Sequence, residues 1–388
     1  NKHQLLLGSP GTGKAQPLYS KILTPNGWVK MKDIKVNSLV RSIDSWVKVT
    51  NVYPQGIKDN VRVFFKDGGY TDCCPEHLWT VYNNINSKGN KGLVVKETID
   101  TNTIIKLLNL KQNKLNNYCN ISVDTPEPID YKEKDFLISP YILGALIGDG
   151  SLTTTSLSLT SIDKEILERV QKELPEKINL TIRKDSISYG ISDNNASWKT
   201  PNRITEELKK LNLLYKKSEF KSIPITYMES SVNQRIALLQ GLMDTDGTTN
   251  KKNSTTTYST SSKELAENIR QLVLSLGGKS SISTKFPFYK DALGNKKEGL
   301  VSYVVSILLP NKKDTFYLSR KQKLLKNTDT KQLRRVVSHI KYLEPTEMQC
   351  ISVDHPSHLY VTDDYLLTHN TYLSLHSAIL DLNYYPDK

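Results

Sequence analysis

The 388-residue sequence lacks any apolar run of the ~18–20 residues that a membrane-spanning helix requires. It also lacks the basic stretch followed by an apolar segment that marks a secretory signal. Cysteine is scarce, and none of the four cysteines forms the paired C-x-x-C spacing typical of zinc sites. These absences argue against a membrane protein and a disulfide-stapled secreted domain, and they predict a cytoplasmic protein.

Acidic residues are outnumbered, with 40 Asp and Glu against 53 Lys and Arg, which gives a formal net charge of +13. A basic surplus spread over the chain favours a polyanion such as DNA or RNA over a small acidic substrate. A biased composition without such a partner is the alternative interpretation. The hydrophobic content of 37% is sufficient for the cores of two or three domains at this length.

A nucleotide-binding motif near the start of the sequence is incomplete. Residues 4–7 predict a short buried strand, and residues 8–14 fit the phosphate-binding pattern G-x-x-x-x-G-K. That pattern needs a Ser or Thr hydroxyl next, to ligate the magnesium ion of a bound nucleotide, but Ala15 follows. Thr371 supplies the missing residue far downstream, and the apolar spacing after it predicts the helix that should follow the loop.

Removal of residues 15–370 would join Lys14 to Thr371 and complete the motif. The sequence therefore predicts two host segments, 1–14 and 371–388, which are separated by an insert that removes itself. The joined segments resemble a P-loop ATPase of the PhoH type. This resemblance implies a nucleotide-phosphate site that exists only after removal of the insert and that consists of Gly8, Gly13, Lys14 and Thr371.

The two ends of the insert, 15–130 and 335–370, contain short strand-like runs. In the first of them, Pro25-Asn26-Gly27 separates two such runs and predicts a hairpin. Several segments resemble the sequence blocks of inteins: Gly27-Trp28 with Lys32-Asp33-Ile34, Cys74-Pro75-Glu76-His77 (usually T-x-x-H), and residues 348–370. The resemblance implies an all-β splicing domain with the horseshoe-shaped Hint fold.

An intein needs an asparagine that cuts the backbone behind itself, and Asn370 stands at that position. Its side-chain amide can attack its own carbonyl, while Thr371 offers an acceptor hydroxyl. Histidine can move protons near neutral pH. The resemblance therefore implies that His358 and His369 assist the asparagine step, and that His77 distorts or protonates the amide at the N-terminal junction.

Ala15 departs from the intein pattern, because most inteins begin with a Cys or Ser that attacks the preceding carbonyl. One interpretation is a class 3-like intein, in which a cysteine near the far end makes the first attack. Trp79, Cys350 and Thr371 match the residues of that class, and a thiol is a suitable nucleophile. The alternatives are an engineered Ala15 that traps the precursor of a class 1 intein, and a Cys350 that is only a small buried core residue.

Residues 136–330 differ in character and contain an internal duplication. Segments 141–150 and 238–247 are apolar, helix-like runs that end in Asp149-Gly150 and Asp246-Gly247. Each is followed by a Ser/Thr-rich stretch and a helix, the second of which we expect to begin with a capping box at Ser261. The pattern resembles single-chain LAGLIDADG homing endonucleases and implies an αββαββα repeat whose strands form a saddle on DNA.

This second resemblance implies that Asp149 and Asp246 hold Mg²⁺ beside the scissile phosphates, since carboxylates suit that ion. A catalytic lysine is expected in each half, with Lys323 one of many candidates.

We expect an α+β chain in which a Hint domain is interrupted by the endonuclease, with no cofactor for splicing. We also expect a monomer whose partner is double-stranded DNA of the uninterrupted host gene, with no membrane partner. Three alternatives stay open: an insert that binds DNA without cutting it, a P-loop ATPase with a DNA-binding insert, and a nuclease without splicing.

Overall fold

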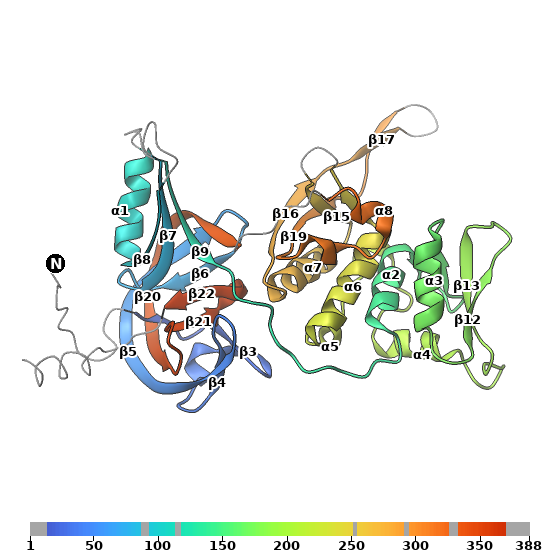
Figure 1. Ribbon diagram of the computed structural model, residues 1–388, viewed down its shortest axis with the longest axis horizontal. Coiled ribbons are helices and arrows are strands. Elements are labelled where there is room, and N and C mark those ends of the chain that lie inside the picture. The colour runs from blue at the N-terminus through green and yellow to red at the C-terminus, as the bar shows by residue number, and fades with distance from the viewer. Residues whose placement is uncertain are drawn as a thin grey trace, which may run out of the picture. The chain divides into compact units, whose positions relative to one another are not determined.

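The computed structural model describes residues 14–86, 93–112, 118–250, 254–290, 295–325 and 333–369. The chain forms two compact units (Figure 1). Unit 1 comprises the described parts of residues 1–127 and 334–388, and unit 2 comprises those of residues 128–333. The chain therefore leaves unit 1 once, builds unit 2 and then returns to complete unit 1.

Unit 1 is built mainly from strands. In the described residues these are β1 (Gln16–Pro17), β2 (Lys21–Thr24), β3 (Gly27–Lys30), β4 (Leu39–Arg41), β5 (Trp46–Phe65), β6 (Tyr70–Cys73), β7 (Leu78–Asn86), β8 (Leu93–Asp100), β9 (Tyr118–Asp124), β20 (Arg334–Val353), β21 (Leu359–Thr362) and β22 (Leu366–His369). One sheet has the order β4-β5-β20-β9-β7-β8, with β1 paired to β20 and β6 to β5. The other sheet has the order β22-β21-β2-β3. Helix α1 (Thr101–Gln112) contacts β8 and β9, and the sequence interpretation as mostly strands missed it.

The expected hairpin around Gly27 is confirmed, because β2 and β3 pair antiparallel with Leu23 opposite Trp28. Gly27 has a φ of 94°, which glycine adopts without the strain that a Cβ would cause. Residue alternation explains the burial of the long strands: Val61, Val63 and Phe65 point into one core while their neighbours do not. β5 and β20 pair antiparallel over most of their length and thereby join the two ends of the insert.

Unit 2 repeats one arrangement of helices and strands. The first copy contains α2 (Pro140–Asp149), β10 (Gly150–Ser151), β11 (Ser158–Thr160), α3 (Lys164–Glu173), β12 (Ile178–Ile182), β13 (Ser188–Asp193) and α4 (Arg203–Lys210). After α5 (Ile225–Met228), the second copy contains α6 (Val232–Thr245), β14 (Gly247–Thr249), β15 (Thr256–Thr260), α7 (Lys263–Ser275), β16 (Lys279–Lys285), β17 (Phe288–Lys290), β18 (Lys296–Glu298), β19 (Ser302–Leu308) and α8 (Ser319–Gln322). The sheet orders β10-β11-β13-β12 and β14-β15-β19-β16 correspond strand for strand. The α+β class and the αββαββα repeat are therefore confirmed, with the β17–β18 hairpin inserted into the second copy.

Helices α2 and α6 lie side by side in the core of unit 2 (Figure 1). Glycine makes this close approach possible. A Cβ on Gly144 would lie 2.3 Å from the carbonyl oxygen of Leu238, and a Cβ on Gly241 would lie 2.2 Å from that of Tyr141. Both helices end where the expected Asp-Gly pairs stand, so the two carboxylates sit at corresponding ends of neighbouring helices.

Helix α7 corrects one sequence expectation. Its N-cap is Ser262, whose hydroxyl accepts a hydrogen bond from the Leu265 amide at 3.1 Å, so the predicted capping box at Ser261 is wrong by one residue. The reciprocal cap occurs instead on α6, between Ser231 and Gln234. None of the helices in the described part of the chain has the length and apolar character needed to cross a bilayer.

Candidate functional site

The N-terminal junction is held inside unit 1. β1 pairs antiparallel with β20 through Gln16 opposite Gln349, and this register, continued by one residue, sets Ala15 across from Cys350. The Ala15 amide, which is the nitrogen of the Lys14–Ala15 bond, donates to the Cys74 sulfur at 3.2 Å. The Cys74 amide donates to the Ala15 carbonyl at 3.0 Å. The nitrogen of the peptide that would have to be broken is therefore held by Cys74, as is the carbonyl of the following peptide, and Ala15 is completely buried.

His77 is fully buried beside this junction. Burial lowers the pKa of His77 to about 3, an effect that the nearby backbone of Lys14 and Ala15 partly offsets. Its Nε2 makes a short hydrogen bond with the Thr368 hydroxyl on β22. The imidazole is therefore neutral at physiological pH, and it connects the junction to the strand that leads to His369.

Trp79 packs against His77. Its ring packs edge-on against the His77 ring, with centroids 5.4 Å apart. Its indole nitrogen donates to the Thr101 hydroxyl at 2.9 Å, and that hydroxyl donates to the His77 carbonyl at 3.1 Å. Trp79 thus fixes both the ring and the backbone of His77.

Cys350 is 1% exposed and lies in β20 at the wall of the same site. The Lys14 side chain interacts electrostatically with Cys350, although burial dominates and lowers the pKa of Lys14. Cys350 also contributes to the raised pKa of the buried Tyr360 hydroxyl, after burial itself. Cys350, Lys14 and Tyr360 are therefore neighbours at the N-terminal junction.

The C-terminal junction is described as far as His369. The rings of His358 and His369 lie 5.9 Å apart; His358 immediately precedes β21, and His369 ends the neighbouring strand β22. Burial lowers the pKa of His358, with a further contribution from the Lys14 charge, so the two junctions share one region of unit 1. Four predicted site residues lie outside the described residues: Gly8, Gly13, Asn370 and Thr371.

Unit 2 contains a second candidate site, at the ends of α2 and α6. Asp149 and Asp246 both reach solvent there. Partial burial and repulsion from Asp246 raise the pKa of Asp149, and partial burial also raises that of Asp246. Tyr258 donates to Asp246 at 3.3 Å. Across the described residues no group of three or more His, Cys, Asp or Glu side chains is placed to hold a metal ion.

Two lysines complete this site, and sequence reasoning did not identify either. The Lys221 ammonium donates to the carbonyls of Ile147 at 2.6 Å and Gly148 at 3.1 Å, at the end of α2. The Lys321 ammonium occupies the corresponding place at the end of α6. Burial lowers the pKa of both lysines, and both interact with Asp149. Lys323, one of the candidates from the sequence, is the C-cap of α8, two residues after Lys321.

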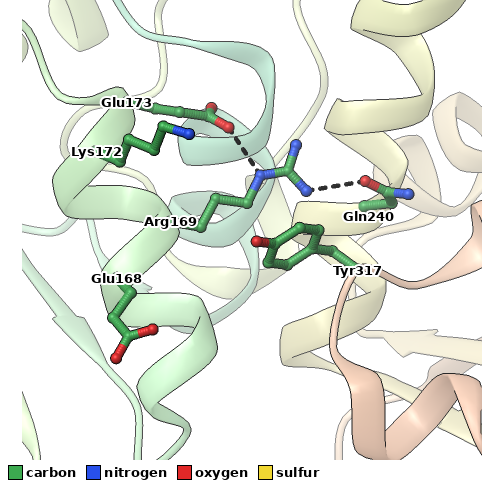
Figure 2. Close-up of a pocket in the computed structure, with 6 residues that line it drawn as sticks. All are labelled: Glu168, Arg169, Lys172, Glu173, Gln240 and Tyr317. Atoms are coloured by element: carbon green, nitrogen blue, oxygen red, sulfur yellow. Dashed lines mark hydrogen bonds and ion pairs between the residues drawn. The ribbon is translucent and has the colours of Figure 1, made fainter.

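A cavity of roughly 500 Å³ lies between α3, α6 and the segment that holds Tyr317 (Figure 2). Arg169 lies in its wall, donating to Glu173 at 2.8 Å and to Gln240 at 2.9 Å. Its guanidinium carbon lies 3.8 Å from the ring centroid of Tyr141 and 4.2 Å from that of Tyr317. Because the guanidinium already contacts two carboxamide or carboxylate groups and two rings, we assign it a structural role joining α2, α3 and α6.

Comparison with known proteins finds a match between part of unit 2 and a family model. Residues 233–308 match the LAGLIDADG-like domain. The chain is 25% identical over 390 residues to the replicative DNA helicase DnaB of Mycobacterium intracellulare, an alignment that covers 96% of this chain and 61% of that protein. The chain thus spans less than two thirds of the length of that relative.

Solved structures also resemble parts of the chain. The crystal structure of the gp41-1 intein is 24% identical, with a TM-score of 0.18, and the match covers 23% of this chain and 81% of that one. The crystal structure of I-DmoI with DNA and Mn is 17% identical, with a TM-score of 0.29, and the match covers 45% of this chain and 92% of that one.

Proposed function

We propose that residues 15–370 excise themselves and join Lys14 to Thr371 by a peptide bond. The observation that carries this proposal is the buried junction: the bond before Ala15 lies in unit 1, across the strand register from Cys350 and beside His77. The interrupted phosphate-binding motif supports it from the sequence side, because excision alone would complete that motif.

The first step is the attack of the Cys350 sulfur on the Lys14 carbonyl carbon. The sulfur–carbon bond forms, the Lys14–Ala15 carbon–nitrogen bond breaks, and the Ala15 amine takes up the proton that the thiol gives up. Ala15 itself has no nucleophilic side chain, whereas Cys350 is held at the junction by β20. Neutral His77, fixed by Trp79 and Thr368, orients the amide during this step.

The later steps transfer and release the acyl group. The Thr371 hydroxyl attacks the thioester, which restores the Cys350 thiol and leaves an ester. The Asn370 side-chain amide nitrogen attacks its own carbonyl, forms a succinimide and breaks the bond to Thr371. The freed Thr371 amine then displaces its own ester to give the peptide bond. His358 and His369, with rings 5.9 Å apart, supply and accept protons at this end.

The intact mass of the expressed chain tests this function directly. We expect an excised product of residues 15–370 and a joined host segment. Cys350→Ala should abolish N-terminal cleavage and leave at most slow cleavage after Asn370. Cys73→Ala is the matched control, because Cys73 is an equally buried cysteine of unit 1 whose thiol contacts Thr101. If Ala15 is an engineered trap, the chain stays whole and only Ala15→Cys restores joining, a result that would overturn the role of Cys350.

Unit 2 is proposed to cleave double-stranded DNA at the uninterrupted host gene. Asp149 and Asp246 fit a divalent cation, because two carboxylates that repel each other at neighbouring helix ends would be stabilised by its charge. A bound Mg²⁺ would supply charge stabilisation to the oxygens of the scissile phosphate. Lys221 and Lys321 hold the helix ends and lie within electrostatic reach of the same position. The match of residues 233–308 to the LAGLIDADG-like domain supports this proposal.

The host protein is proposed to be a P-loop ATPase. The similarity to a replicative DNA helicase favours a helicase as the host over the PhoH-type ATPase that the flanking residues resemble, and the PhoH assignment stays a prediction. A cytoplasmic location and a monomeric state likewise stay predictions. A nucleotide-binding assay on the whole and the joined chains would test the host site, which should bind only after joining.

A further inference from the structure

The side chain of Gln16, one residue beyond the N-terminal junction, is completely buried and fully hydrogen-bonded. Its amide nitrogen donates to the Thr71 hydroxyl at 3.1 Å and to the Asp72 carbonyl at 3.3 Å. Its amide oxygen accepts from the Tyr360 hydroxyl at 2.7 Å. Three strands, β1, β6 and β21, therefore meet at one side chain.

The partners of Gln16 are themselves fixed. The Thr71 hydroxyl donates to the Asp363 carboxylate at 3.0 Å, and the other oxygen of Asp363 accepts from the Lys21 amide at 2.9 Å. Tyr360 is 1% exposed and is an electrostatic neighbour of Cys350. One network thus connects Gln16, the second residue after the scissile bond, to the wall that holds the attacking thiol.

Stability alone does not account for this arrangement. An apolar side chain of the same shape in a closed core is often as stable as a satisfied polar one, because folding only exchanges hydrogen bonds with water for internal ones. A satisfied polar network differs in that it permits a single geometry and penalises every other. Next to a bond that the thiol must attack from one direction, a single fixed geometry raises the rate of the attack.

We propose that Gln16 is a positioning residue for the first splicing step, and that it holds the Lys14 carbonyl in line with the Cys350 sulfur. The inference rests on the proposed splicing function and adds a role for Gln16, which the proposed mechanism does not use. Gln16 touches neither the nucleophile nor the carbonyl, so it acts through the backbone of β1. Because β1 has only two residues, the hydrogen bonds of Gln16 act together with those between Ala15 and Cys74 to fix the direction in which the chain enters the site.

Removal of the hydrogen bonds should slow N-terminal cleavage and spare C-terminal cleavage. A displacement of about 1 Å at a reacting centre costs on the order of 100-fold in rate. We therefore expect Gln16→Met, which keeps the length and loses the bonds, to slow the first step by about 10- to 100-fold. Cleavage after Asn370 depends on groups at the other junction and should change by less than about threefold.

Gln16→Glu provides a second variant whose effect depends on pH. A carboxylate can accept from Tyr360 but cannot donate to Thr71 or the Asp72 carbonyl. A protonated carboxyl can accept from Tyr360 and also donate its one proton to either Thr71 or the Asp72 carbonyl. Burial raises the pKa of a carboxyl, so protonation should restore positioning as the pH falls from about 8 to about 5.5. The ratio of the Gln16→Glu rate to the parent rate at the same pH should rise in that direction.

The two steps are measured in separate backgrounds of the full-length chain. Asn370→Ala isolates N-terminal cleavage, followed as hydroxylamine release of residues 1–14 by mass spectrometry. Cys350→Ala isolates cleavage after Asn370. Gln349→Met is the matched control, because Gln349 is the strand partner of Gln16 and is also buried, with 7% of its surface exposed. Its side-chain amide donates to a different group, the Met31 carbonyl, over a distance of 2.9 Å.

Selective slowing of the first step by Gln16→Met, with pH-dependent recovery by Gln16→Glu, would support the proposal. Equal slowing of both steps, to the extent seen for Gln349→Met, would show a merely structural role and overturn it. Unchanged N-terminal cleavage in both Gln16 variants would also overturn it while leaving the splicing function intact. A parent chain without N-terminal cleavage would instead overturn the splicing function, and this inference with it.

Discussion

Substitution of Gly241 by Ala should separate the two central helices of unit 2. A Cβ at this position would lie 2.2 Å from the Tyr141 carbonyl oxygen and 2.8 Å from the Ala145 nitrogen, both of them backbone atoms that no side-chain rotation can move. Non-bonded atoms do not pack closer than about 3.2 Å, so the helices must move apart by about 1 Å. Overpacking of this kind costs about 1–3 kcal/mol, more than the roughly 0.8–1 kcal/mol that Gly→Ala gains in a helix.

Denaturant unfolding followed by the helical circular dichroism signal would measure this loss, because most described helices belong to unit 2. Gly148→Ala offers a matched control. Its Cβ would meet the Thr245 hydroxyl at 2.0 Å and the Thr245 Cβ at 2.8 Å, so the double variant Gly148→Ala with Thr245→Ala, which removes the hydroxyl, should recover part of the lost stability. Gly241→Ala has no such rescue. A Gly241→Ala chain as stable as the parent would refute the backbone contact as the reason for glycine here.

Three further predictions concern the reactions and the pH. Asp246→Asn should abolish Mg²⁺-dependent cleavage of a DNA carrying the uninterrupted host gene while leaving DNA binding and splicing unchanged, and gel assays with and without metal would reveal any residual cutting. Asn370→Ala should prevent release of residues 371–388, since no other side chain predicted there can cyclise, and a joined product in the mass spectrum would contradict the mechanism. Because the pKa of His77 falls from 6.5 to about 3 on folding, its neutral form stabilises unit 1 above pH 6.5, and this stability is lost as the pH falls toward 3. His77→Asn should make the acid side of the unfolding profile shallower, and an unchanged slope would show that His77 is not the titrating group.

The sequence correctly predicted the elements that depend on residues close together in the chain. The hairpin at Gly27, the helices ending at Asp149 and Asp246, and the order of the repeat all follow from turn residues, apolar periodicity and duplication. The close packing of those helices was not predicted from the residues, although their glycines, which lack a Cβ, are what permits it.

The features that the sequence did not predict depend on contacts between residues far apart in sequence. Lys221 and Lys321 carry no local signal, since each becomes special only when a distant helix end reaches its ammonium. In the sequence Gln16 is an ordinary polar residue, and only the folded chain shows its hydrogen bonds with Thr71 and Tyr360. Helix α1 was missed because its apolar positions, Ile104 among them, pack on a sheet whose strands precede and follow it.

The place where the chain leaves and re-enters unit 1 has an evolutionary consequence. Asp124, at the end of β9, is the antiparallel partner of Arg334, at the start of β20, and the two side chains form an ion pair at 3.1 Å. The exit and the return are therefore neighbours on adjacent strands, as in a hairpin that a few residues could close. Unit 2 could be gained or lost as a single genetic cassette at this point without re-pairing any strand. The proposed DNA cleavage by unit 2 could then be lost while the proposed splicing by unit 1 is kept.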